Sequence, residues 1–128
     1  MSTLLAAINT DSAPKPFGHY VQAIDTGGLV FVSGQLPARV DGTSLADASF
    51  ETQARQSLAN LLAIVEGAGL RRDRIAKVTA YLVGVEHWSA FNAIYAEAFG
   101  EHRAARSVVP VSALHHGYLI ELDAIAVR

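Results

Sequence analysis

The chain of 128 residues contains no cysteine, which excludes disulfide bonds, thiolate catalysis and metal sites with cysteine ligands. Charged residues are also scarce, at 17%, and the net charge of −2 comes without a basic run. Because phosphate binding needs a positive surface, nucleic acid is not expected as the main ligand. No segment reaches membrane-spanning length without charges, and residues 1–13 lack the basic start and long apolar core of a signal peptide. We therefore expect a cytoplasmic protein.

Apolar residues, by contrast, are abundant and make up 51% of the chain. Its length is typical of one domain, so we expect a single domain over residues 1–128. A domain of this size has little interior in which to bury so much apolar surface. Part of that surface is therefore expected to lie in a contact between subunits.

Hydrophobic periodicity divides the chain into five strands and two helices. Alternating and β-branched residues predict a hairpin around a Thr-Gly-Gly turn at residues 26–28. Apolar residues at helical spacing predict a first helix that is capped by Ser49 or Asp47. Residues 1–18 are expected to form an irregular arm, and residues 36–47 a loop. The predicted strands span residues 20–25, 29–34, 75–83, 106–111 and 118–127, with a turn near 115–117; the first helix ends at Gly67 and Gly69, and the second spans residues 88–99.

The same periodicity assigns side chains to the core or to solvent. In the first helix, Gln53 and Asn60 fall on the polar face and are expected in solvent. In the second helix, Trp88 opens the apolar stripe. In the strand over residues 75–83, Ala76 is expected to point to the same side as Val78.

The predicted element order is β-β-α-β-α-β-β, an α/β (α+β) fold with two helices on one face of a single mixed sheet. No helix remains to cover the other face, so we expect self-association through that open face. Its mixed side chains include Lys77, Thr79, Glu121 and Asp123.

Arg106 and Glu121 are the candidate residues for chemistry. The planar guanidinium of arginine holds a carboxylate through two parallel hydrogen bonds, and Arg106 opens an apolar strand. Glu121 can orient or deprotonate a water, and Asp123 lies on the same strand face, where repulsion raises one pKa of such a pair. Together they suggest a site where water attacks a small anionic substrate. The same residues also fit a strand with a solvated charged face and an ordinary surface arginine.

The remaining polar residues do not form a recognisable motif. No two of the five histidines have the i, i+4 spacing of a helical metal site, so we expect solvated histidines and no metal. His115 and His116 would point apart on a strand. Ser33 or Ser107 could join a triad on paper, but the nucleophile-elbow pattern is absent. Arg103 is assigned to solvent.

Five segments, taken in order, resemble the RidA family, also called YjgF/YER057c/UK114. The similarity extends from about residue 14 to residue 128. The segments are Phe17-Gly18-His19-Tyr20-Val21-Gln22-Ala23, Val32-Ser33-Gly34-Gln35-Leu36-Pro37, Gln53-Ala54-Arg55-Gln56-Ser57-Leu58-Ala59-Asn60, Ala105-Arg106-Ser107 and Ile120-Glu121-Leu122-Asp123-Ala124-Ile125-Ala126.

The resemblance implies a chorismate-mutase-like fold and a homotrimer with sites between subunits. It implies a hydrolase without a cofactor that deaminates reactive enamines and imines, such as 2-iminopropanoate and 2-iminobutanoate, to 2-oxo acids and ammonia. The family's carboxylate-binding arginine corresponds to Arg106 and its water-orienting glutamate to Glu121. Its substrate-binding tyrosine, serine and asparagine correspond to Tyr20, Ser33 and Asn92.

Three departures from the family pattern concern the same site. His19 stands where the family often has proline, and Val108 where many members have a cysteine whose main-chain carbonyl helps to hold the water. The connector before Arg106 is also a few residues shorter. Three other functions remain open: a non-catalytic protein that binds small carboxylates, an endoribonuclease or translation inhibitor, and a 2-aminomuconate-type deaminase.

Overall fold

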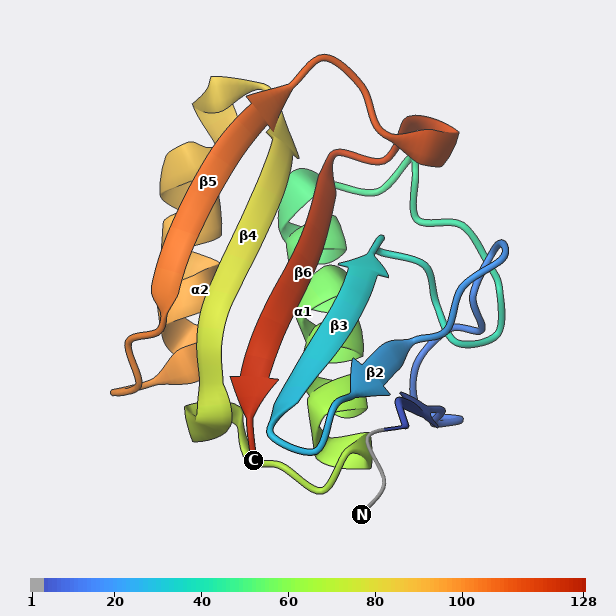
Figure 1. Cartoon of the computed structure of the whole chain (residues 1–128). Helices are drawn as coiled ribbons and strands as arrows, with labels where there is room; N and C mark the ends of the chain where they lie inside the picture. The colour runs from blue at the N-terminus through green and yellow to red at the C-terminus, as the bar shows by residue number, and fades with distance from the viewer. Residues whose placement is uncertain (1–3) are drawn as a thin grey trace.

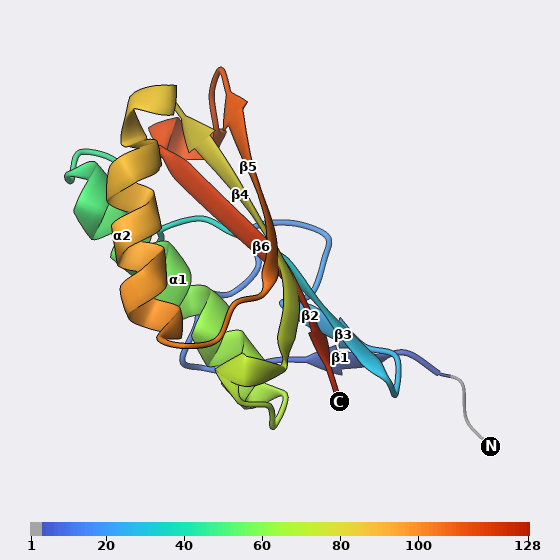
Figure 2. The same cartoon turned by 90° about the vertical axis from the view of Figure 1, so that its left-hand side faces the viewer.

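Within residues 4–128, which the computed structural model describes, six strands form one mixed sheet and both α-helices pack on the same face (Figures 1 and 2). The strand order is β1-β2-β3-β6-β4-β5, and all neighbours are antiparallel except β4 and β5. The strands are β1 (Ala6–Ile8), β2 (Ala23–Asp25), β3 (Leu29–Gln35), β4 (Ile75–Val83), β5 (Ala105–Val111) and β6 (Ile120–Val127). The helices are α1 (Phe50–Gly67) and α2 (Trp88–Phe99), and the 3-10 turns are η1 (Arg72–Arg74), η2 (Val85–His87) and η3 (His115–Gly117).

The expected α+β arrangement is confirmed, with one strand more than the sequence predicts. The arm expected to be irregular contributes β1, where Ala7 pairs with Ile24 of β2. Residues 20–22, predicted to be extended, lie before β2. Among them, Gln22 is buried and its amide nitrogen donates to the carbonyl of Thr10 at 3.0 Å and that of Pro14 at 3.1 Å, which fastens the arm to the sheet.

The core lies between the sheet and the helices. Along β6, Ile120, Leu122 and Ala124 are buried, whereas Glu121 and Asp123, which alternate with them, are half-buried and face away from the helices. Figure 2 shows both helices on one side of the sheet. The open face predicted from the sequence is therefore present, and it carries an apolar side chain at Phe31, which is 43% exposed.

Two polar residues of α1 contradict the solvent-facing assignment. Gln53 is buried because its amide nitrogen donates to Ala48 O at 3.1 Å and its amide oxygen accepts from Leu119 N at 2.9 Å. Asn60 is buried because its amide nitrogen donates to Ala38 O at 2.9 Å. These bonds satisfy main-chain groups of the adjacent loops, and burial of a polar side chain is favourable only with such partners. The cap predicted at Ser49 is confirmed, since its hydroxyl accepts from the main-chain nitrogen three residues later at 3.1 Å.

Two apolar residues were also assigned to the wrong side. Trp88 is 48% exposed because it is the first residue of α2, one turn ahead of the fully buried Phe91. Ala76 is exposed because the pairing of β4 with β6 is irregular between Ile75 and Lys77, so Ile75 fills the inner position instead. Within residues 4–128, neither helix has both the length and the apolar composition needed to cross a membrane.

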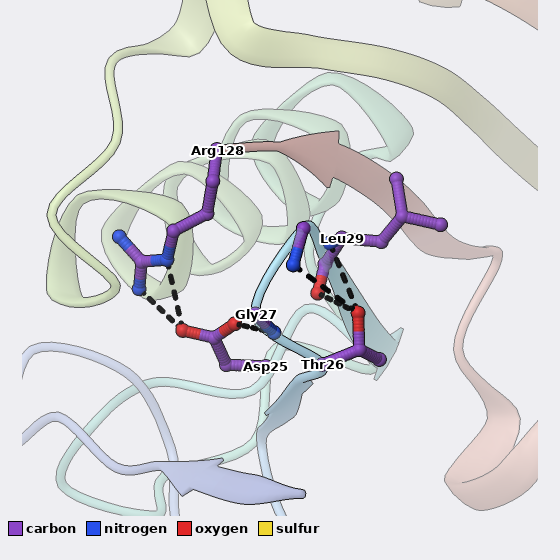
Figure 3. Close-up of polar contacts among 6 residues, drawn as sticks. Asp25, Thr26, Gly27, Leu29 and Arg128 are labelled. Atoms are coloured by element: carbon purple, nitrogen blue, oxygen red, sulfur yellow. Dashed lines mark hydrogen bonds and ion pairs between the residues drawn. The ribbon is translucent and has the colours of Figure 1, made fainter. Parts of the chain in front are cut away.

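The predicted turn between β2 and β3 is confirmed and is fastened to the end of β6 (Figure 3). Gly27 adopts a φ of +99°, and its nitrogen donates to Asp25 Oδ1 at 2.7 Å. Arg128 donates to the other oxygen of Asp25 at 2.6 and 2.9 Å. These bonds to Arg128, and then the bond from Gly27, lower the pKa of Asp25 below its ordinary value. Arg128, which follows β6, thus ties the hairpin to the end of that strand.

Candidate active site

Arg106 lies on the edge strand β5 and turns toward α2. Its Nη2 donates to Asn92 Oδ1 at 3.1 Å, and its Cζ lies 4.7 Å from the ring centroid of Tyr95 and 5.5 Å from that of Phe91. The side chain is thus half-buried, stacked on aromatic rings and fixed by an amide. A guanidinium has five N–H donors, so the bond to Asn92 leaves the capacity to hold a carboxylate through two hydrogen bonds.

A cavity of about 570 Å³ opens beside Arg106, Asn92 and Tyr95. Burial raises the pKa of Tyr95, against the opposing effect of the Arg106 charge, so a neutral phenol lies under the cation. Arg103 is exposed, as expected, but it also lines this cavity. Val108 follows two residues after Arg106 on the same side of β5, where its side chain packs against the core.

Glu121 lines a different cavity, of about 580 Å³, together with Tyr20 and Ser33. The hydroxyl of Tyr20 accepts a hydrogen bond from Phe17 N at 3.1 Å, and that of Ser33 donates to Val21 O at 2.7 Å. Both side chains are therefore fixed by the main chain before β2. The other lining residues are Phe17, Gly18, Gly34, Leu36, His115 and His116.

Gly34 gives the carboxylate of Glu121 its position over β3. The pairing of β3 with β6 is irregular between Val32 and Gln35, and Gly34 lies within that interval. A Cβ at Gly34 would lie 3.0 Å from Cδ of Glu121 and closer still to one carboxylate oxygen. Only glycine leaves room for the carboxylate there.

The pKa of Glu121 lies above its ordinary value of 4.5, chiefly because the side chain is partly buried. The charge of His115 opposes this rise, and the charge of Asp123 adds to it. Burial also raises the pKa of Asp123, although a hydrogen bond from Tyr81 at 3.2 Å and the charge of Lys77 oppose the change. A carboxylate with a raised pKa is a better proton acceptor than an ordinary one, which suits a base that activates water.

One chain does not bring the two groups of candidate residues into one cavity. Arg106 and Asn92 lie on the helix side of the sheet, and Val108 packs toward the core on that side. Glu121 belongs to the open side, because it alternates with the buried residues of β6. Within one chain, Arg106 and Glu121 therefore line cavities on opposite sides of the sheet.

His115 and His116 were expected to be solvated and to point apart. Both are exposed, but they lie in the turn η3 rather than on a strand, and both line the Glu121 cavity. A turn was predicted at these residues, and neighbouring side chains of a turn need not diverge. Among residues 4–128, no three histidine or acidic side chains gather in an arrangement that could hold a metal ion.

Known proteins are similar to this chain over nearly its whole length. The family model described as Endoribonuclease L-PSP matches residues 10–128. The 2-iminobutanoate/2-iminopropanoate deaminase of Escherichia coli K12 is 43% identical over 124 residues, which cover 94% of this chain and 96% of that protein. RutC family protein PH0854 of Pyrococcus horikoshii is 41% identical over 121 residues, with the same coverage of 94% and 96%.

A solved structure is similar to this chain in both fold and sequence. The crystal structure of Escherichia coli TdcF with bound serine superposes with a TM-score of 0.91 at 38% identity, covering 96% of this chain and 98% of that one. Sequence and structure agree on the family that the motifs resemble, and the chain belongs to the RidA family, whose model carries the description Endoribonuclease L-PSP.

Proposed function

We propose that this protein hydrolyses reactive 2-imino acids and their enamine tautomers, such as 2-iminobutanoate and 2-iminopropanoate, to 2-oxo acids and ammonia. The observation that carries the proposal is the fixed guanidinium of Arg106 together with a Glu121 carboxylate of raised pKa. The guanidinium of Arg106 can bind the substrate carboxylate, and the carboxylate of Glu121 can accept a proton from an attacking water. The 43% identical relative named as a deaminase of these two substrates supports the same reaction.

The active site is composite in this proposal and forms between two copies within a homotrimer. One copy contributes Arg106 and Asn92, with the main-chain carbonyl of Val108 nearby to help hold the water. The adjacent copy contributes Glu121, Tyr20 and Ser33. The half-buried carboxylates and exposed apolar side chains of the open sheet face fit an interface, because a second copy would shield them from water.

The reaction then needs little beyond positioning and proton transfer. Arg106 holds the substrate carboxylate, Asn92 keeps the guanidinium in place, and Glu121 accepts a proton from the water that attacks the imine carbon. Such imines also hydrolyse in water alone, so a modest gain from orientation and acid–base help is sufficient. The residues in these roles supply this help without a cofactor.

A second candidate function is binding without turnover. A relative whose structure holds serine supports it, since serine carries the carboxylate that Arg106 would hold. Arg106 serves both functions, whereas Glu121 is needed only for hydrolysis. An endoribonuclease function, suggested by the family description, is disfavoured by the net charge of −2 and the absence of a basic run in the sequence. The cytoplasm, where pyridoxal-phosphate enzymes release such imines, remains the expected location.

The proposal is tested by coupling the protein to a pyridoxal-phosphate threonine dehydratase, which releases the imine precursor of 2-oxobutanoate. Adding the protein should accelerate 2-oxobutanoate formation in proportion to its concentration. Binding without turnover predicts the opposite result: no acceleration, while serine or 2-oxobutanoate still binds. Calorimetric titration with those two ligands distinguishes a binding protein from an inactive preparation.

A further inference from the structure

The Glu121 cavity contains two imidazoles that the proposed reaction has not used. His115 and His116 precede Gly117 in η3, and this turn leads into β6, which carries Glu121. Both histidines line the cavity with Tyr20, Ser33 and Glu121. Histidine is the side chain most often used to transfer protons near neutral pH.

The turn has an unusual backbone that orients both rings. His116 adopts a φ of +61° and a ψ of 16°, the left-handed region, and no other non-glycine residue within residues 4–128 has a positive φ. The centroid of its ring lies 5.8 Å from the ring centroid of Phe17, 6.1 Å from that of Tyr118 and 6.0 Å from that of His115. Non-glycine residues in this region are often found at functional sites. Here the conformation places two adjacent side chains in one cavity.

His115 also acts electrostatically on the catalytic carboxylate. Its charge lowers the pKa of Glu121, against the raising effects of burial and of Asp123. The titratable groups lining this cavity are Glu121 of β6, Tyr20 before β2, and His116 in the same turn. An imidazole and a carboxylate that line one cavity can supply a proton donor and a proton acceptor to the same substrate.

We propose that His115 is a second catalytic residue of this site, the proton donor for the nitrogen that leaves as ammonia, with His116 as the positioning residue that holds it in the cavity. The proposal rests on the deaminase function. As water adds to the imine carbon, a C–O bond forms and the C=N π electrons move to nitrogen, which takes the proton of imidazolium His115. Glu121 receives the proton of the water.

The second half of the reaction restores both groups. The amino nitrogen of the tetrahedral intermediate takes a further proton from Glu121, the C–N bond breaks and ammonia leaves. The hydroxyl oxygen forms the 2-oxo group and returns its proton to His115. The sum is imine plus water giving 2-oxo acid plus ammonia, with no oxidant, reductant or further reactant.

The test compares His115→Gln with wild type in the dehydratase-coupled assay between pH 5 and pH 9, on proteins of equal oligomeric mass and circular dichroism. We expect kcat to fall by about 10²-fold at neutral pH, the lower end for general acid–base catalysis, with KM little changed. We also expect the ratio of wild-type to variant kcat to be larger at the acid end of this range than at the alkaline end, because only wild type has a side chain at this position that can donate a proton. Titration of the imine itself is common to both proteins, so it cancels in the ratio of their rates.

Chemical rescue provides a second readout that a merely structural role would not produce. Free imidazole should restore part of the activity of His115→Ala, and His87→Gln, a change outside the cavity, should keep the wild-type profile. If His115→Gln retains the rate and pH profile of active wild type, this proposal is overturned and the deaminase function stands. If wild type does not accelerate 2-oxobutanoate release at all, both proposals are overturned.

Discussion

Three neighbours on α2 suit Arg106 to the carboxylate-binding role that we propose. An exposed arginine is mobile and its ion pairs contribute little, whereas this guanidinium is stacked on the rings of Tyr95 and Phe91 and bound to Asn92. A fixed fork loses less conformational entropy when it binds a carboxylate.

Replacing that fork should therefore impair turnover strongly. Arg106→Ala should lower kcat/KM for 2-iminobutanoate by about two to four powers of ten, since each charge-assisted bond contributes roughly 1.5–3 kcal/mol. Arg106→Lys should recover little, because an ammonium cannot form two parallel bonds. Arg103 lines the same cavity and is a poor control, so we choose Arg55→Ala, which removes only an exposed pair with Glu97. A loss below about threefold in Arg106→Ala would contradict the carboxylate-anchor role.

The raised pKa of Glu121 predicts the acid limb of the pH profile. Glu121 must be unprotonated to accept a proton from water, so activity should fall as the pH drops through its pKa, which lies above 4.5. Because the charge of Asp123 contributes to that rise, Asp123→Asn should move the limb to lower pH. A limb that moves to higher pH, measured as kcat/KM from pH 4 to pH 8, would contradict this assignment. Glu121→Gln should remove turnover and retain serine binding.

For single residues, the sequence was sufficient to nominate the candidate side chains, but it did not predict what surrounds each of them. A lone arginine before an apolar strand and a glutamate within a later strand were sufficient to nominate Arg106 and Glu121. The sequence pattern alone did not reveal that they lie on opposite sides of the sheet, because the side that each faces depends on how β5 and β6 pair with β4. His115 and His116 were set aside because they lack metal-site spacing and were expected to point apart on a strand, whereas they lie in the turn η3 and line the Glu121 cavity.

Among the elements, β3 has the most direct influence on the site, through its glycine. Gly34→Ala should lower kcat/KM by about tenfold to a hundredfold, because displacement of a catalytic group by about 1 Å has effects of that size. The fold should persist, since the carboxylate can swing away. Gly28→Ala is the matched control: it lies in the turn before β3, and a Cβ there meets nothing within 4 Å. Equal rates for the two variants, measured on folded protein, would exclude the proposed role of Gly34.

Helix α1 stabilises the loops beside the site through a buried polar side chain. Gln53→Leu should reduce the free energy of unfolding by about 1–3 kcal/mol, because the carbonyls of Ala46 and Ala48 and the amide of Leu119 lose their partner. Denaturant titration measures the change. A variant as stable as wild type would mean that water or other groups replace these bonds.

Elements with a long repeating pattern of apolar residues were predicted well, whereas the short strand β1 was not predicted. The boundaries of α2 were predicted to the residue, because its stripe runs from one turn to the next and ends at Gly100 with a φ of +62°. Strand β1 has three residues with little burial, so periodicity cannot reveal it. It pairs with β2, and the residue after next in the arm, Thr10, is bound to Gln22, a tertiary contact that periodicity does not predict.

For the whole molecule, the homotrimer that we propose would account both for the uncovered sheet face and for the placement of Arg106 and Glu121 in different cavities of one chain. A sheet covered on one side leaves Phe31 and the half-buried Glu121 and Asp123 facing outward. The excess of apolar residues in the sequence predicts an interface between subunits, and this stays a prediction; which residues of two copies would meet cannot be read from the sequence of one chain. Light scattering should return three times the 13.6 kDa mass of the chain.

Subunit complementation tests the shared site most directly. Arg106→Ala and Glu121→Gln are each expected to be inactive, and they are to be refolded together at equal amounts so that mixed trimers form. A site with Arg106 from one chain and an intact Glu121 from its neighbour then arises at about a quarter of the interfaces by random assembly. We expect the mixture to recover about a quarter of the wild-type deaminase activity per chain, and each variant refolded alone to recover none. Mixed trimers that stay as inactive as the separate variants would contradict a site built from two subunits.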